Sequence, residues 1–388
     1  MLRVRLIHGG VLAVALVAAV MPVTSGAAVG LAPAAHTSAR VAKALWRPDA
    51  AVRAIAVSRT RVFVAGDFTH VRNTTTGRKV RRDRVAAFNR STGALIRDFH
   101  PRVNGSVKAL ALLGRKLVLG GTFTSLNGRS RMNLAAVKAK AGRLSSWRAQ
   151  VDGPVLTLLS MDGVVYAGGD FDNVNGVARA NLAALDGRAV LSPTWPDQAT
   201  GTTNKTVFAL AASADRSSVL VGGSFTILAG SPRTYLGQIA RASGAVTGWS
   251  PAPVCVKCFV KSLIARKSRV YAGMAGPGGE AVAFRQDTGA LIWRRHANGN
   301  VDAIAFAGNY LVIGGHFTTV AGRRHRMFAQ LGARHGALTK RRPQTKGSPF
   351  PGILALDVHD HRIRMGGDFA NVAGQARYGV MAERSSPT

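Results

Sequence analysis

The sequence has few of the residues that build disulfide scaffolds or long helices. Its 388 residues include only two cysteines, which excludes a framework of several disulfides. Only two of its 18 acidic residues are glutamates, and this shortage disfavours long exposed helices. Acidic residues are also scarce against 52 lysines and arginines, so the formal net charge is +34. Because 47% of the chain is hydrophobic, it can still build a large core and is no disordered basic tail.

Long apolar runs are also missing, with one exception near the N-terminus. The run Val11–Val20 is shorter than the roughly 20 residues that span a membrane. Two arginines precede it, and the small residues Ser25 and Ala27 precede a plausible cleavage point. This pattern is typical of a secretory signal peptide over residues 1–27, with an uncleaved anchor as the alternative. We therefore expect a secreted, extracellular protein, peripheral to the cell envelope if attached to it, with no transmembrane segment after cleavage.

A short motif of the form Gly-Gly-x-Phe organises the rest of the chain. A degenerate copy of the motif, Tyr271–Met274, lies in the widest gap between the other copies. Recurrence about every 50 residues is typical of repeat architectures, and the sequence therefore predicts seven repeats. The phenylalanines that end the clear copies are Phe68, Phe123, Phe171, Phe225, Phe317 and Phe369.

Each repeat contains four short apolar stretches separated by turn residues, a pattern that predicts four antiparallel strands. Four strands repeated seven times predict an all-β fold, a seven-bladed β-propeller of four-stranded antiparallel blades. We expect the propeller to cover residues 45–385, after a short linker at 28–44. In the second repeat the stretches are Val107–Ala111, Lys116–Gly121, Asn133–Val137 and Gly142–Trp147.

The two ends of the predicted propeller complement each other. The last repeat, from Ile353 to Glu383, supplies three strands, and Leu45–Asp49 forms an unpaired fourth strand before the first repeat. Pairing this N-terminal strand with the last blade would close the ring and leave no open sheet edge.

Aromatic residues recur in the predicted fourth strands. Packing between neighbouring blades is the favoured interpretation, and a ring of sugar-binding aromatics is the alternative. The residues are Trp46, Phe99, Trp147, Trp195, Trp249 and Trp293.

The repeat resembles a known family. Its pattern consists of Gly-Gly-x-Phe, then Asn/Ala-Gly, then Arg, then Leu-Ala-Ala, and finally Thr-Gly-x-Leu-x-x-Trp. The pattern resembles the short-repeat β-propellers of secreted bacterial proteins, which are mostly of unknown function. These in turn are similar to the propeller of fungal cortical-polarity markers. The stretch Ala283–Trp293 is also similar to the repeat of quinoprotein-like propellers. The resemblance covers the whole mature chain and implies an architecture, but no established catalytic residues.

The long connections should share one face, because second-to-third and fourth-to-first connections of a four-stranded meander emerge together. Loops on a rigid scaffold are where binding residues concentrate, so we expect the site on this face. Much of the basic excess lies in Arg72–Arg84, Arg323–Arg326 and Lys340–Lys346, which predicts a basic face. The alternative explanation of the basic excess is a coding bias toward arginine. The longest connections are Val71–Arg84, Pro196–Thr206, Ser250–Phe259 and Lys340–Gly352.

Two sets of repeated side chains are candidates for that site. A recurring arginine could form a crown that binds phosphate, carboxylate or sulfate; the alternative is a structural role, bonding a carbonyl or a motif aspartate. The variable residue of Gly-Gly-x-Phe could form a polar collar, although identical positions on different blades stand too far apart for a metal site. The crown is Arg82, Arg131, Arg179, Arg233, Arg326 (or His325) and Arg377; the collar is Asp67, Asp170, His316 and Asp368.

The cysteines, Cys255 and Cys258, lie three residues apart in a loop. Two thiols alone do not complete a zinc site, and the βαβ setting of a thioredoxin-like motif is missing. In an exported chain a local disulfide is the expected state.

No catalytic motif is recognisable, and no metal or cofactor is predicted. We therefore predict a non-enzymatic binding or scaffold propeller that engages an anionic polymer, a cell-envelope component or a protein partner, and is a monomer. The alternative is a quinoprotein-like oxidoreductase or a polysaccharide-active enzyme. Specific nucleic-acid binding is not expected, because no reading motif accompanies the charge.

Overall fold

The computed structural model describes residues 46–196, 199–200, 205–341, 345–346, 352–368, 371–372, 375–376 and 380–384. All of them lie in one compact unit, residues 39–388. Within these ranges the chain forms strands and turns and no helix, so the prediction of an all-β propeller is confirmed. No helix capable of crossing a membrane occurs in this part of the chain. The predicted signal peptide and linker lie outside the described residues.

Within the described ranges seven sheets repeat one antiparallel arrangement, and we number them as blades 1 to 7 in chain order. Blade 2 shows all four strands, in the order β12-β11-β8-β7 from its outer to its inner edge. The strands are β2 (Val52–Val57), β3 (Arg61–Gly66) and β6 (Val85–Asn89) in blade 1; β7 (Ser106–Leu113), β8 (Lys116–Thr122), β11 (Asn133–Lys138) and β12 (Leu144–Gln150) in blade 2; β13 (Val155–Met161), β14 (Val164–Gly169) and β17 (Leu182–Leu185) in blade 3; β19 (Val207–Ala212), β20 (Ser218–Gly223) and β23 (Leu236–Ala240) in blade 4; β24 (Phe259–Arg266), β25 (Arg269–Ala275), β26 (Gly279–Arg285) and β27 (Leu291–Ala297) in blade 5; β28 (Val301–Ala307), β29 (Tyr310–Gly315) and β32 (Phe328–Gly332) in blade 6; and β34 (Gly352–His359), β35 (Arg362–Asp368) and β38 (Val380–Arg384) in blade 7.

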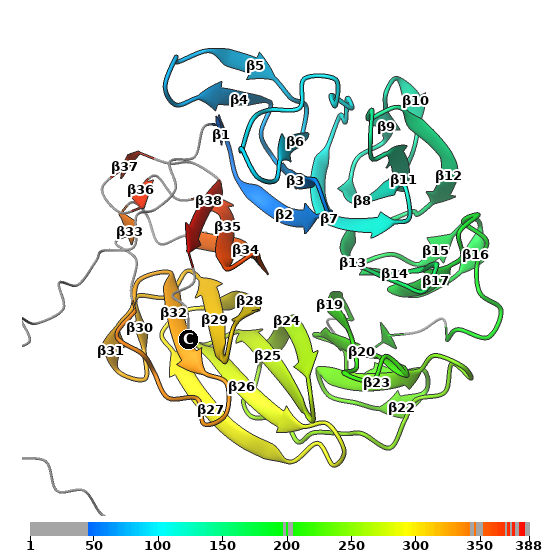
Figure 1. Ribbon diagram of the computed structural model, residues 1–388. Helices are drawn as coiled ribbons and strands as arrows, with labels where there is room; N and C mark the ends of the chain where they lie inside the picture. Colours follow the sequence, from blue (N-terminus) through cyan, green and yellow to red (C-terminus); the bar gives the residue numbers. More distant parts are fainter. Residues whose placement is uncertain are drawn as a thin grey trace, which may run out of the picture. The chain divides into compact units, whose positions relative to one another are not determined.

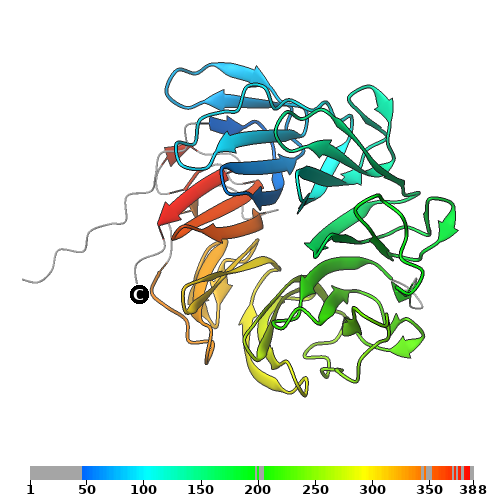
Figure 2. The same cartoon turned by 45° about the vertical axis from the view of Figure 1, so that its right-hand side comes forward.

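The inner strands surround a common axis (Figures 1 and 2). Each packs against the inner strand of the next blade, from β2 and β7 through to β28 and β34, and β34 packs against β2. The core lies between blades as well as within them. Val118 of blade 2, for example, shares a buried cluster with Val155 and Val165 of blade 3.

Close packing explains the paired glycines of the Gly-Gly-x-Phe motif. A Cβ atom on Gly120 would lie 2.6 Å from Cγ1 of Val155 in the next blade. A Cβ atom on Gly121 would lie 2.0 Å from the carbonyl oxygen of Ser106 in the inner strand. The first glycine therefore admits the neighbouring blade, and the second admits the backbone of its own inner strand.

The fourth-strand tryptophans lie between blades. Trp147 is buried and its Nε1 donates a hydrogen bond of 2.9 Å to the carbonyl of Asp186 in the next blade. Trp249 and Trp293 make equivalent bonds of 2.9 and 3.1 Å to carbonyls of the following blade. These contacts fit the packing interpretation and leave the rings covered by protein.

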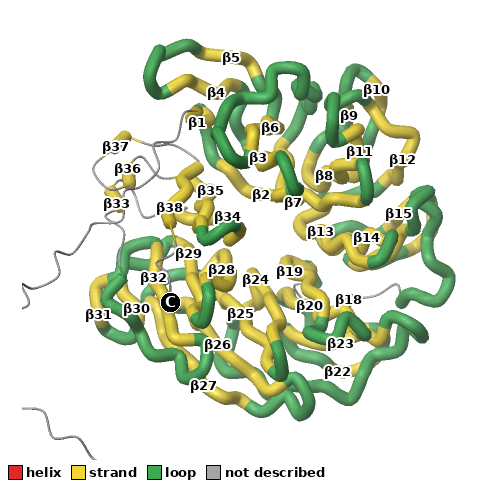
Figure 3. The backbone as a smooth tube through the Cα atoms, in the orientation of Figure 1, coloured by secondary structure: helices red, strands yellow, loops and turns green. Residues whose placement is uncertain are grey.

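Short β-hairpins follow the second strands and lie at the outer edge of the blades (Figure 3). The strand β1 (Trp46–Pro48) pairs with the hairpin of blade 1, much as the end of β27 pairs with the hairpin of blade 6 through Ala297 and Val320. Its predicted pairing with the last blade stays a prediction. The hairpin strands are β4 (His70–Asn73) and β5 (Lys79–Arg81), β9 (Ser125–Leu126) and β10 (Arg129–Ser130), β15 (Asn173–Val174) and β16 (Val177–Ala178), β21 (Ile227–Leu228) and β22 (Ser231–Pro232), β30 (Thr319–Val320) and β31 (Arg323–Arg324), and β36 (Asn371–Val372) and β37 (Gln375–Ala376).

Candidate functional site

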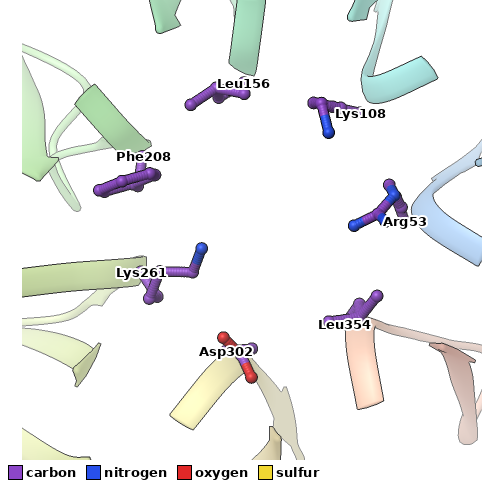
Figure 4. A pocket seen from close by; sticks show the side chains of 7 residues that line it. All are labelled: Arg53, Lys108, Leu156, Phe208, Lys261, Asp302 and Leu354. Atoms are coloured by element: carbon purple, nitrogen blue, oxygen red, sulfur yellow. The ribbon is translucent and has the colours of Figure 1, made fainter. Parts of the chain in front are cut away.

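Every inner strand has a β-bulge near its start. In β2 the pairing register with β3 shifts between Val52 and Ala54, so the residue between them leaves the ladder. The same shift recurs in the inner strands of the other six blades. Bulges redirect side chains, and here the seven skipped residues point toward the axis of the propeller (Figure 4). They are Arg53, Lys108, Leu156, Phe208, Lys261, Asp302 and Leu354.

These seven residues line a cavity of about 300 Å³, which we call the axial cavity. Going around it, the basic pair Arg53 and Lys108 is followed by two apolar residues (Figure 4). Lys261 and Asp302 come next, and a leucine completes the circuit. The lining thus contains three cationic groups and one carboxylate.

Arg53 is held in place by a carboxylate of its own blade. Its Nε donates a hydrogen bond of 2.7 Å to Oδ2 of Asp67, and its Nη2 lies 2.7 Å from the same oxygen. The hydroxyl of Ser106 donates to Oδ1 of Asp67 at 2.5 Å. Burial opposes ionisation of Asp67, but the bonds from Arg53 and Ser106 outweigh it and lower the pKa of the carboxyl.

The side chain of Asp302 is only 8% exposed. Nδ1 of His316, which directly follows the second strand of the same blade, lies 3.6 Å from its Oδ2. Burial raises the pKa of Asp302, although the positive charge of Lys261 and the contact with His316 act in the opposite direction.

Lys108 and Lys261 have no carboxylate in contact. Among the described residues neither ammonium group makes a hydrogen bond or an ion pair, and Lys261 Nζ lies 4.5 Å from the centroid of the Phe208 ring. Desolvation lowers the pKa of both lysines, and the charge of Arg53 acts in the same direction. The charge of Asp302 opposes this shift at Lys261, and that of Asp67 opposes it at Lys108. With three cationic groups against one carboxylate, the lining keeps an excess of positive charge.

Two of the four residues of the predicted polar collar contact axial residues in the structure. Asp67 and His316 contact the axial residues of their own blades, and the partner of Asp67 is Arg53 rather than the crown residue Arg82. Asp170 is exposed and Asp368 is partly buried, and neither contacts the axial lining. In the described ranges, no three His, Cys, Asp or Glu side chains are placed to hold a metal ion.

The predicted arginine crown bonds backbone carbonyls within its own blades. Arg82 is buried, and its Nη2 donates to the carbonyl of Arg97 at 3.0 Å. Arg233 donates in the same way to Thr247 at 2.7 Å. These contacts support the structural alternative, and a ligand-binding role for the crown stays a prediction. Arg131 and Arg179 donate to the carbonyls of the residues before them, Arg326 is partly buried, and Arg377 lies outside the described residues.

Cys255 and Cys258 are joined by a disulfide in the loop that leads into β24. Cys258 is buried under blade 5, whereas Val256 between the two cysteines is 84% exposed. The bridge lies in the connection from blade 4 to blade 5, and its cysteines do not line the axial cavity.

The axial residues were missed in the sequence, although a signal for them exists. In each repeat they follow the first branched apolar residue of the inner strand and precede a small residue. Val52-Arg53-Ala54 and Val260-Lys261-Ser262 show the pattern. Aligning the repeats at this position would have collected all seven residues.

Comparisons with known proteins bear on the fold. No family model matches the sequence. No curated protein matches it either. Among solved structures, the chain is similar to the WD40 β-propeller domain of Doa1, with a TM-score of 0.55 and 15% identity over 88% of this chain and 94% of that chain. It is also similar to the computationally designed Ika8 protein, with a TM-score of 0.53 and 16% identity over 87% of this chain and 97% of that one. At these identities the likeness establishes the fold alone, and the fold is that of a β-propeller.

Proposed function

We propose that this protein is a secreted, non-enzymatic binding propeller that engages an anionic polymer of the cell envelope through the hairpins at the outer edge of its blades. The observation that carries the proposal is the distribution of exposed basic residues on the hairpins. A propeller supplies a rigid scaffold for such a surface, and fixed charges of one sign attract a polyanion over a distance of several ångströms.

The basic residues gather on one side of the ring of hairpins. We call this surface the basic arc and define it as Arg72, Arg78 and Lys79 of blade 1, Arg129 of blade 2 and Arg323 of blade 6, all exposed. Among the described residues, Lys79 is the one member of the basic arc with an ion-pair contact, its Nζ lying 3.9 Å from Oδ2 of Asp49.

The hairpins of blades 3 and 4 differ from the basic arc. Their four strands contain no lysine or arginine, and they expose the apolar residues Val177 and Ile227 instead. Because the residues of the basic arc come from blades 6, 1 and 2, a bound polymer would contact these blades rather than encircle the molecule. Such a surface also supports a binding role more directly than a uniform basic excess does.

A charge-neutralising variant of the basic arc tests the proposal. We combine Arg72→Gln, Arg78→Gln, Lys79→Gln and Arg129→Gln, and measure binding to an immobilised acidic polysaccharide at about 0.1 M salt. Because each removed charge weakens a screened surface attraction, we expect binding at least about tenfold weaker.

The matched control removes the same charge from the opposite ends of the strands in the same two blades. It combines Arg59→Gln, Arg115→Gln, Lys138→Gln and Lys140→Gln, all at exposed positions. We expect this variant to bind within about twofold of the wild type. An equal loss in both variants would show that only net charge matters, and no loss in the arc variant would refute the proposed surface.

A further inference from the structure

We propose that the axial cavity is a second, separate binding site, which takes one oxyanion group, such as a carboxylate, sulfate or phosphate, carried on a small apolar body. This second site is distinct from polymer binding by the basic arc, because its lining residues all come from the inner strands. The juxtaposition that carries it is two lysines without an acidic contact and one fixed arginine, all directed into a cavity lined otherwise by apolar groups and a single carboxylate.

The charges of the cavity are unbalanced in a way that one anion would correct. Arg53 already has a partner in Asp67, at 2.7 Å. Lys108 and Lys261 have none within ion-pair distance in the described part of the chain. Asp302 acts on Lys261, and Asp67 on Lys108, only from beyond that distance. The two lysines come from opposite sides of the lining and point inward (Figure 4). An oxyanion between them would accept charge-assisted hydrogen bonds from both ammonium groups.

The site is built before any ligand binds. Asp67 and Ser106 fix the guanidinium of Arg53, and His316 contacts Asp302. Each axial side chain starts from a bulge in a strand that is packed on both sides. A group held in this way loses little conformational freedom on binding, so more of the interaction contributes to affinity.

Size and lining decide what kind of anion fits. A volume of about 300 Å³ is at the lower end for small-molecule pockets and too small for a folded polymer segment. Leu156 and Leu354 form apolar walls, whereas Lys261 covers the ring of Phe208. An apolar organic acid therefore fits better than a strongly hydrated inorganic ion, because its body contacts the leucines while its acid group lies between the lysines.

Titration of the full chain with small probes tests this site. The probes are benzoate, phenyl phosphate, inorganic phosphate and uncharged benzyl alcohol, and binding is measured by calorimetry. We expect benzoate or phenyl phosphate to bind at least about tenfold more tightly than benzyl alcohol and inorganic phosphate. The aromatic acid that binds more tightly identifies the type of oxyanion. If neither acid binds better than benzyl alcohol, the site is refuted, and equal affinity for inorganic phosphate would refute its apolar part.

Variants then locate the binding. Lys108→Met and Lys261→Met should each weaken binding of the preferred acid about 10- to 100-fold, and Lys108→Arg should restore most of it. Lys140→Met, at the far end of blade 2, should have no effect. The arc variant should bind the acid as the wild type does, so failure of the polymer proposal would leave this result unchanged. Unaltered affinity in the Lys108→Met and Lys261→Met proteins would overturn the assignment, provided that thermal unfolding shows both to be folded.

Discussion

The two axial lysines are placed where folding alone would favour an apolar residue. Three of the seven equivalent positions hold leucine or phenylalanine, so the fold accepts apolar side chains there. Lys108 and Lys261 instead bring charges whose desolvation lowers their pKa. A charge retained at a cost to stability is a signature of binding sites, because stability and function then make opposite demands on one residue.

This conflict makes a prediction about Lys108. Replacing it by methionine, which keeps the length of the side chain, should raise the free energy of unfolding at neutral pH by about 0.5–1 kcal/mol, because a poorly compensated charge is removed. The expected gain is small because the lysine is only partly buried. Urea denaturation measures it, with Lys140→Met as an exposed control that should change stability by less than about 0.5 kcal/mol. A clear loss of stability in the Lys108→Met protein would mean that the ammonium stabilises the fold.

At the scale of strands, two features of each repeat act together. The bulge in the inner strand turns one side chain toward the axis, and the glycine pair of the second strand makes room for that backbone. In blade 2 the shift lies between Val107 and Ala109, directly after the Ser106 carbonyl that approaches Gly121. The motif that made the repeats visible in the sequence therefore serves packing, and the functional variation lies in the strand that it packs against.

The second glycine of the motif supplies a direct test of that packing. In Gly121→Ala the new methyl would lie 2.0 Å from the carbonyl oxygen of Ser106, so the backbone must move. We expect a loss of at least about 3 kcal/mol in the free energy of unfolding. Gly128→Ala is the control, since its Cβ would meet no atom within 4 Å and its φ of +76° alone should cost about 1 kcal/mol. Equal losses in urea denaturation would contradict the role of Gly121 in blade packing.

How far the sequence predicts the molecule depends on the element. The strands of a blade follow from period and turn residues, and the collar residues Asp67 and His316 follow from the motif. Their axial partners Arg53 and Asp302 do not, because strict alternation assigns no direction to a residue that leaves the ladder at a bulge. The crown arginines show a different limit. A guanidinium suits a carbonyl as well as a phosphate, so only the contact of Arg82 with a backbone carbonyl favours the structural role.

At the scale of the whole molecule, the net charge of +34 has several uses. Some arginines, such as Arg82 and Arg233, bond carbonyls inside the blades. Arg53 and two lysines line the axial cavity, and a third group of basic residues forms the basic arc on the hairpins of blades 1, 2 and 6. The total charge therefore predicts little by itself, and the position of each charge on the repeated scaffold decides whether it can meet a ligand.

The most direct test of the proposed function is the salt dependence of polymer binding. The dissociation constant of the wild-type protein for a soluble acidic polysaccharide would be measured from about 0.05 to 0.5 M salt. Since surface charges separated by more than the Debye length are screened, we predict that affinity falls at least about tenfold over this range. An affinity that stays constant as salt increases would contradict the proposal that the basic arc holds an anionic polymer.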